Sequence, residues 1–160
     1  MRALNRYTLW TLLLAGAMAT VAFDFFGQSL SPMLGFASLA PVPLANNVIQ
    51  TVFGAPYTPA AHLLHYIAGM IAYPAGWMFV AQPLARRITP GLPWLAVAVI
   101  YGIGLWILAL YIMASLIAGQ PAFLGFTGIT WEALVGHVLF AIIAAMVVRW
   151  RDGRLGGMAM

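Results

Sequence analysis

The chain has 160 residues, of which 64% are hydrophobic and only 6% are charged, and its formal net charge is +4. In soluble domains roughly a quarter of all residues are charged, so this composition excludes a soluble globular fold. The high hydrophobicity also excludes a disordered chain, and the lack of cysteine excludes a disulfide scaffold. The class that remains is an integral membrane protein.

Four apolar windows are long enough to form membrane spans, each of which needs roughly 20 mainly apolar residues. In chain order they cover about residues 8–26, 61–81, 93–117 and 131–148. The apolar runs are continuous and do not alternate, so each window predicts a helix and not a barrel strand. We therefore predict an all-α polytopic membrane protein with four transmembrane helices, which form a single domain over residues 1–160.

The start of the chain has a second interpretation. Arg2 and Arg6, followed by an apolar run and an Ala-Met-Ala sequence at residues 17–19, are also typical of a signal peptide and its cleavage site. Cleavage there would leave three spans. The apolar run continues to Phe26, which favours a retained first span.

The positive charges predict the orientation of the spans. The connections at residues 27–60 and 118–130 contain no Arg or Lys. All seven positive charges flank the other span ends: Arg2 and Arg6 before the first window, Arg86 and Arg87 between the second and third, and Arg149, Arg151 and Arg154 after the fourth. The positive-inside rule then predicts a protein of the bacterial inner membrane with both termini in the cytoplasm. The sequence pI of about 10.0 is thus a sign of topology and does not indicate a nucleic acid partner.

The long connection at residues 27–60 contains a second helical pattern. Apolar residues recur at helical spacing from Leu44 to Phe53, Pro43 suits the first turn, and Gly54 suits the end. We favour a short helix that lies in the outer interface, and the alternative is a re-entrant segment that lines a cavity. In the second span, Pro74 is expected to cause a kink.

Five titratable side chains gather in the outer half of the predicted bundle: Asp24, His62, His65, Glu132 and His137. His62 and His65 are three residues apart and share a helix face, although His62 can equally face water. The alternative for Glu132 is a purely structural role, in which its negative charge stabilises a helix N-terminus. His137 lies among apolar residues, where it needs a hydrogen-bond partner on another helix or a ligand.

These residue types permit several ligands without requiring any. Histidines and carboxylates bind zinc, copper or iron, with His65 and His137 as the first candidates for a metal. The same two histidines, on different helices at similar depth, are also suitable axial ligands for haem. The sequence contains no cysteine nucleophile and no glycine-rich phosphate loop, so we predict no catalytic residue.

Two stretches carry a family resemblance. Residues 65–88 open with His65 and end in a Gln82-Pro83 turn and two arginines, and residues 119–121 (Gly-Gln-Pro) precede Gly136-His137 in a helix that ends in arginines. In these features the chain resembles the YagU-like inner-membrane proteins, a family without an assigned activity. The resemblance covers the second to fourth spans. It implies a four-helix layout and points to His137, but it implies no reaction.

Two functions follow as hypotheses. The first is a non-catalytic helix-packing protein, a small accessory subunit of a larger membrane complex that contacts lipid and other membrane subunits or associates with itself. Small residues four apart support it, because they let helices approach closely: Ala15 and Ala19, Ala68, Ala72 and Gly76, and Ala141 and Ala145. The alternative is a binding protein whose outer histidines and carboxylates hold a metal, haem or another small ligand.

Overall fold

The structure, a computed structural model, describes residues 4–158 and the side chains of residues 4–153. Arg2 and the side chain of Arg154 therefore lie outside the described part. Within that part the chain forms helices and no strand. Four helices are long and apolar enough to cross a membrane, namely Arg6–Met33, Thr58–Ile88, Trp94–Ile117 and Gly128–Gly153. The predictions of an all-α class and of four spans are confirmed.

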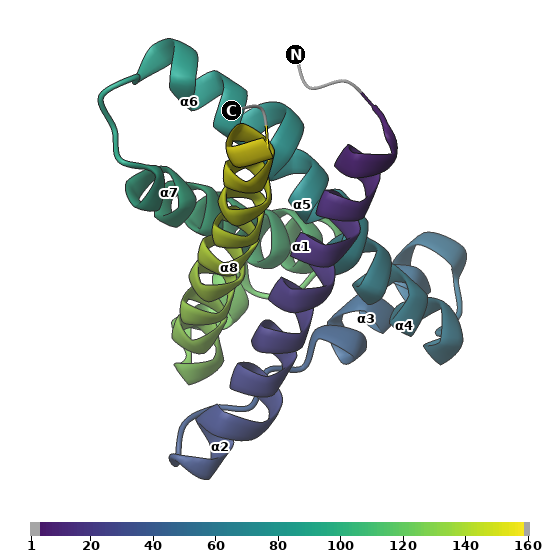
Figure 1. Ribbon diagram of the computed structural model, residues 1–160. Helices are drawn as coiled ribbons and strands as arrows, with labels where there is room; N and C mark the ends of the chain where they lie inside the picture. The colour runs from purple at the N-terminus through teal and green to yellow at the C-terminus, as the bar shows by residue number, and fades with distance from the viewer. Residues whose placement is uncertain (1–3, 159–160) are drawn as a thin grey trace.

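The spans are built from consecutive α-helical and π-helical segments (Figure 1). The first contains α1 (Arg6–Phe25), η1 (Phe26–Leu30) and α2 (Ser31–Met33). The second contains α4 (Thr58–Ile67), η2 (Ala68–Ala72), α5 (Tyr73–Gly76), η3 (Trp77–Ala81) and α6 (Gln82–Ile88). The third contains α7 (Trp94–Ile107) and η4 (Leu108–Ile117), and the fourth is α8 (Gly128–Met158). The connections contain α3 (Pro41–Phe53) and a short 3-10 turn, η5 (Ala122–Phe126).

The first span is longer than the predicted 8–26 because its polar residues are satisfied locally. Asn5 caps α1 by accepting a hydrogen bond of 2.9 Å from the Thr8 backbone N–H. Beyond Phe26, where the apolar window ends, the Gln28 amide donates to Asp24 Oδ1 at 2.8 Å. The Ser31 hydroxyl donates to the Ala37 carbonyl oxygen at 2.8 Å. The helix therefore continues through residues that the hydropathy pattern assigned to a loop.

Three of the π-helical segments are explained by proline. The segments η1, η2 and η3 each end two residues before a proline: Pro32, Pro74 and Pro83. Proline has no N–H, and its ring clashes with the carbonyl group four residues earlier. A widened turn before the proline relieves this clash, and the span then continues as a helix beyond Pro74, where we expected a kink. In a π-helical pattern the Gly27 carbonyl would accept a hydrogen bond from the N–H of residue 32, but Pro32 has no N–H. The Gly27 carbonyl instead accepts a hydrogen bond of 2.8 Å from the Leu39 N–H.

The fourth span is the centre of the bundle, because α8 packs against both α1 and α7. Small residues permit this close packing. A Cβ on Gly102 of α7 would lie 2.6 Å from the Val138 Cα of α8. The alanine stripes of the first and fourth spans are fully buried: Ala15, Ala19, Ala141 and Ala145 have no exposed surface. They hold this chain's own helices together.

The start of α1 and the end of α8 lie at the same end of the bundle as α6 (Figure 1). The Tyr7 hydroxyl donates to the Arg151 carbonyl oxygen, and Arg151 Nε donates to Thr11 Oγ1 at 3.2 Å. The Arg149 guanidinium lies 5.1 Å from the centre of the Trp94 ring, at the start of α7. We call this end of the bundle, with Arg6, Arg86, Arg87, Arg149 and Arg151, the arginine end.

The helix α3 confirms the pattern seen between Pro43 and Gly54. It spans Pro41–Phe53 and ends at Gly54, whose φ of 82° is the left-handed conformation that glycine adopts readily. Its inner face buries Ala45, Val48 and Ile49, and Ala45 and Ile49 pack against α4. The helix thus forms a hairpin with α4 and one wall of a cavity.

Candidate functional site

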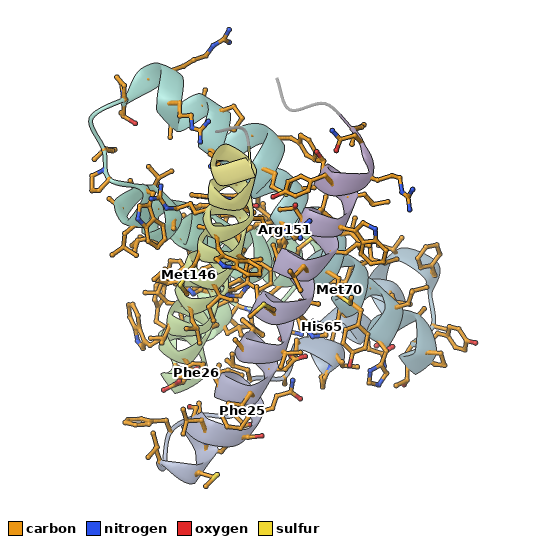
Figure 2. All side chains as sticks on the ribbon, in the orientation of Figure 1. Phe25, Phe26, His65, Met70, Met146 and Arg151 are labelled. Carbon is orange, nitrogen blue, oxygen red and sulfur yellow. The ribbon has the colours of Figure 1, made fainter. Side chains whose placement is uncertain are left out.

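The first and second spans bring Asp24 and His65 together. These spans run antiparallel and approach closely at two glycines. A Cβ on Gly16 would lie 2.2 Å from the Met70 carbonyl oxygen, and a Cβ on Gly69 would lie 2.4 Å from Thr20 Oγ1. In Figure 2, Met70 and His65 lie one after the other beside α1, and His65 is farther from the arginine end. The glycines thus permit the contact between the two titratable side chains.

His65 and Asp24 form a partly buried hydrogen-bonded pair. His65 Nε2 lies 3.0 Å from Asp24 Oδ1 and 3.3 Å from Oδ2. Their side chains are 13% and 25% exposed, respectively. A carboxylate only accepts hydrogen bonds, so the His65 ring carries a proton on Nε2 and presents this N–H to Asp24.

His137 is held by its own helix. Its Nδ1 lies 2.7 Å from the Ala133 carbonyl oxygen, one turn earlier in α8. That oxygen can only accept, so Nδ1 carries the proton, and in the neutral ring Nε2 is left as an acceptor. Gly136 brings α1 close to this position, because a Cβ there would lie 2.9 Å from the Phe23 ring.

Phe23 lies between the two histidines. Its ring centre is 6.5 Å from that of His65 and 5.1 Å from that of His137, which it meets edge to face. Tyr73 packs on His137 as well, with ring centres 6.4 Å apart. The two histidines therefore lie in one region of the bundle, as predicted, but their rings are separated by an aromatic side chain.

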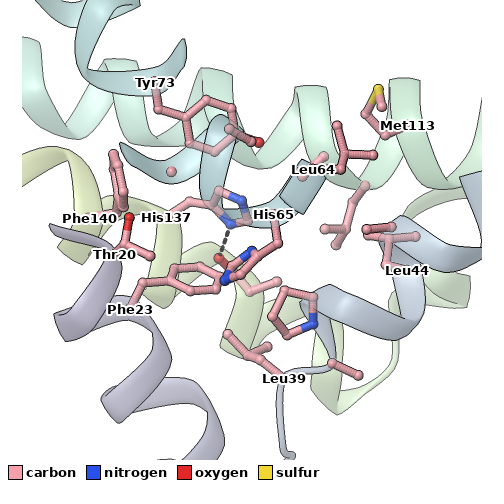
Figure 3. A pocket seen from close by; sticks show the side chains of 18 of the residues that line it. Thr20, Phe23, Leu39, Leu44, Leu64, His65, Tyr73, Met113, His137 and Phe140 are labelled. Atoms are coloured by element: carbon pink, nitrogen blue, oxygen red, sulfur yellow. Dashed lines mark hydrogen bonds between the residues drawn. The ribbon is translucent and has the colours of Figure 1, made fainter. Parts of the chain in front are cut away.

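Both histidines border a cavity of about 170 Å³. Its wall is nearly all apolar and comes from all four spans, from α3, from the connection just before α3 and from the η5 turn before α8. Figure 3 shows the rings of His65, His137 and Phe23 on one side of this space, with Leu44, Leu64 and Met113 on the other. None of the described residues that line the cavity is an Asp, Glu, Lys or Arg.

The π-helical segments and a strained turn shape this cavity. The η2 and η4 segments contribute Ala68, Gly69, Ala109, Leu110 and Met113 to its wall, and π-turns inside helices are frequent at functional sites. The η5 turn contributes Leu124, whose φ of 55° is unusual for a residue other than glycine. Part of the irregular backbone of the bundle, in η2, η4 and η5, therefore borders the cavity.

The other candidate residues lie elsewhere. His62 is exposed and stacks on Tyr66, with ring centres 6.5 Å apart. Glu132 is half-buried in the first turns of α8, and neither residue lines the cavity. Asp24 contacts His65 but does not itself line the cavity. Among the described residues no three His, Asp or Glu side chains are grouped closely enough to hold a metal ion, so the five candidates do not form one metal site.

Sequence reasoning missed two polar residues of the cavity wall, Thr20 and Tyr73. Thr20 is 4% exposed, and its hydroxyl has no hydrogen-bond partner among the described residues. Tyr73 precedes Pro74, and its backbone carbonyl accepts a hydrogen bond of 2.6 Å from the Tyr101 hydroxyl. Two signals in the sequence point to them. Thr20 is a polar residue inside an apolar span, and Tyr73 directly precedes a proline inside the second span.

Comparison of the chain with protein-family models, with curated proteins and with solved structures finds no match. The resemblance to the YagU-like proteins therefore stays a prediction.

Proposed function

We propose that this chain is a multi-pass protein of the bacterial inner membrane that binds a small, mainly apolar molecule in the cavity beside His65 and His137. The cavity itself carries the proposal. Protein interiors are packed as densely as organic crystals and leave few voids larger than a water molecule. A space of about 170 Å³, bordered by aromatic rings and two histidines, is larger than such voids and has room for a small ligand.

The described residues favour an organic ligand over a metal or haem. A metal needs three or more ligands, and the histidines and carboxylates near the cavity offer no group of that size. Pockets for drug-sized molecules usually measure about 300–1,000 Å³, and haem is larger than such a molecule. The space of about 170 Å³ beside the two histidines would enclose only part of a haem.

The arginine positions support cytoplasmic termini. Arg6, Arg86, Arg87, Arg149 and Arg151 all belong to the end of the bundle that carries α6, the start of α1 and the end of α8. The positive-inside rule assigns that end to the cytoplasm. The cavity then lies toward the periplasmic side.

The accessory-subunit hypothesis has weaker support. One of its arguments is the stripes of small residues, and those of the first and fourth spans are already buried between helices of this chain. The second-span stripe is partly exposed, as expected for a surface that faces lipid.

A matched pair of alanine substitutions tests the binding function. Ala109 lines the cavity, whereas Ala72 is exposed and does not line it. We expect purified wild-type protein in nanodiscs to bind 4-fluorotoluene by ¹⁹F NMR titration against empty nanodiscs. Ala109→Leu should weaken this binding by at least about tenfold, because the added carbons fill the space, and Ala72→Leu should leave it unchanged.

Mass spectrometry of the same preparations tests for a natural ligand. An organic molecule extracted in stoichiometric amount from wild type and Ala72→Leu, but not from Ala109→Leu, would support the proposal. The accessory-subunit hypothesis would gain support if a stoichiometric protein partner co-purified equally with all three proteins. If the wild type bound no small aromatic probe, neither an apolar one nor one that carries a hydroxyl group, the binding function would be refuted.

A further inference from the structure

The size of the cavity limits its occupant. A cavity of about 150 Å³ lined by apolar side chains is known to accept benzene, and the space beside His137 measures about 170 Å³. A single six-membered ring with one or two small substituents has the matching volume.

The chemistry of His137 specifies one polar group on that occupant. His137 is 6% exposed, and its Nδ1–H is used by the Ala133 carbonyl. Among the described residues Nε2 has no hydrogen-bond partner. Among the described residues, the fully occluded side-chain N and O atoms without a partner are Thr20 Oγ1 and Trp77 Nε1. His137 Nε2 is not one of them, so it keeps accessible surface. The space that His137 borders is the cavity.

A buried acceptor without a partner is costly, and a ligand with an O–H or N–H group would remove this cost. An anionic group would meet the lone pair of Nε2 and no cation, because no described Lys or Arg lines the cavity. A cationic group would lose its hydration in a mainly apolar space, while the Asp24 carboxylate is already engaged by His65 and Gln28. The favoured ligand is therefore uncharged.

We infer that the occupant is a neutral, single-ring molecule with one hydrogen-bond donor, of the phenol class, and that His137 Nε2 accepts this hydrogen bond. The inference rests on the proposed binding function and names its ligand class. Phe23 and Tyr73 are placed to contact the ring, since both line the cavity and pack on His137.

Three probes of similar size test the inference: 4-fluorophenol has a donor, 4-fluorotoluene has none, and 4-fluorobenzoate is an anion. Each is titrated by ¹⁹F NMR into protein in nanodiscs and into empty nanodiscs. We expect wild-type protein to bind 4-fluorophenol about tenfold more tightly than 4-fluorotoluene, as one net hydrogen bond provides. Binding of 4-fluorobenzoate should be undetectable.

Histidine variants assign the preference to one side chain. His137→Leu should bind the two neutral probes equally, and His62→Leu, at an exposed histidine away from the cavity, should keep the wild-type preference. Equal binding of phenol and toluene by the wild type would overturn the inference and leave the proposed binding function standing. Binding of neither probe would overturn both. The wild-type comparison decides these outcomes even if a variant fails to fold.

Discussion

Asp24 and His65 illustrate how single residues join the first two spans. They are 41 positions apart in the chain, yet His65 Nε2 lies 3.0 Å from Asp24 Oδ1. Polar groups that leave water are stabilised only when they are paired, and Gln28 provides a further hydrogen bond to Asp24. The pair thus stabilises the contact between α1 and α4 next to the cavity.

A double-mutant cycle measures this contact. We expect Asp24→Ala and His65→Ala to show a coupling free energy of about 1 kcal/mol in thermal or denaturant unfolding, followed by tryptophan fluorescence in detergent. The control cycle combines Asp24→Ala with His62→Ala, because His62 is one turn earlier in α4 and exposed. Its coupling should be near zero, and equal coupling in the two cycles would contradict the contact.

Prolines and glycines control how the spans are shaped and how closely they pack. Pro32, Pro74 and Pro83 each follow a π-helical segment, and widened turns of this kind shift the register of the side chains beyond them. Gly16 and Gly69 allow α1 and η2 to touch along their backbones. Local backbone chemistry thereby determines which side chains reach the cavity.

Two glycines provide a test of this packing. Gly16→Ala would place a Cβ 2.2 Å from the Met70 carbonyl oxygen, whereas a Cβ on Gly104 meets no atom within 4 Å. We expect Gly16→Ala to lower the free energy of unfolding by about 1–3 kcal/mol because the backbone has to shift. Gly104→Ala should leave it nearly unchanged or slightly higher. The midpoints of thermal unfolding in one detergent compare the two, and equal midpoints would count against the close approach.

The four spans return the chain to the end of the bundle from which α1 starts, and the described arginines gather there. Arginine is costly to move across a bilayer, so the proposed topology keeps this end in the cytoplasm. In that topology the cavity lies toward the opposite side of the membrane.

The native chain contains no cysteine, which makes single-cysteine labelling unambiguous. Thr89→Cys lies in the connection beside Arg86 and Arg87, and Ser38→Cys lies in the connection between α2 and α3; both positions are exposed. We expect a membrane-impermeant maleimide to label Ser38→Cys in intact spheroplasts and Thr89→Cys only after permeabilisation. The reverse pattern would invert the proposed topology.

Much of the fold follows from the sequence because a bilayer imposes strong and simple constraints. A span has to be apolar and has to satisfy its own backbone hydrogen bonds, so hydropathy identified all four helices, and the Pro43–Gly54 pattern identified α3. The end of the first span was placed too early, at residue 26. Gln28 and Ser31 are polar by composition, but contacts within a few residues satisfy them.

Composition along the chain is enough to predict the class of the protein, the number of its spans and the gathering of its arginines at one end. It does not show which polar residues meet, because this depends on how the helices pack: Asp24 pairs with His65, His137 bonds its own helix, and Phe23 separates the two histidines. Helix rotation and close approach determine such contacts. The cavity is likewise a product of packing, because residues far apart in the sequence, from four spans and α3, form its wall.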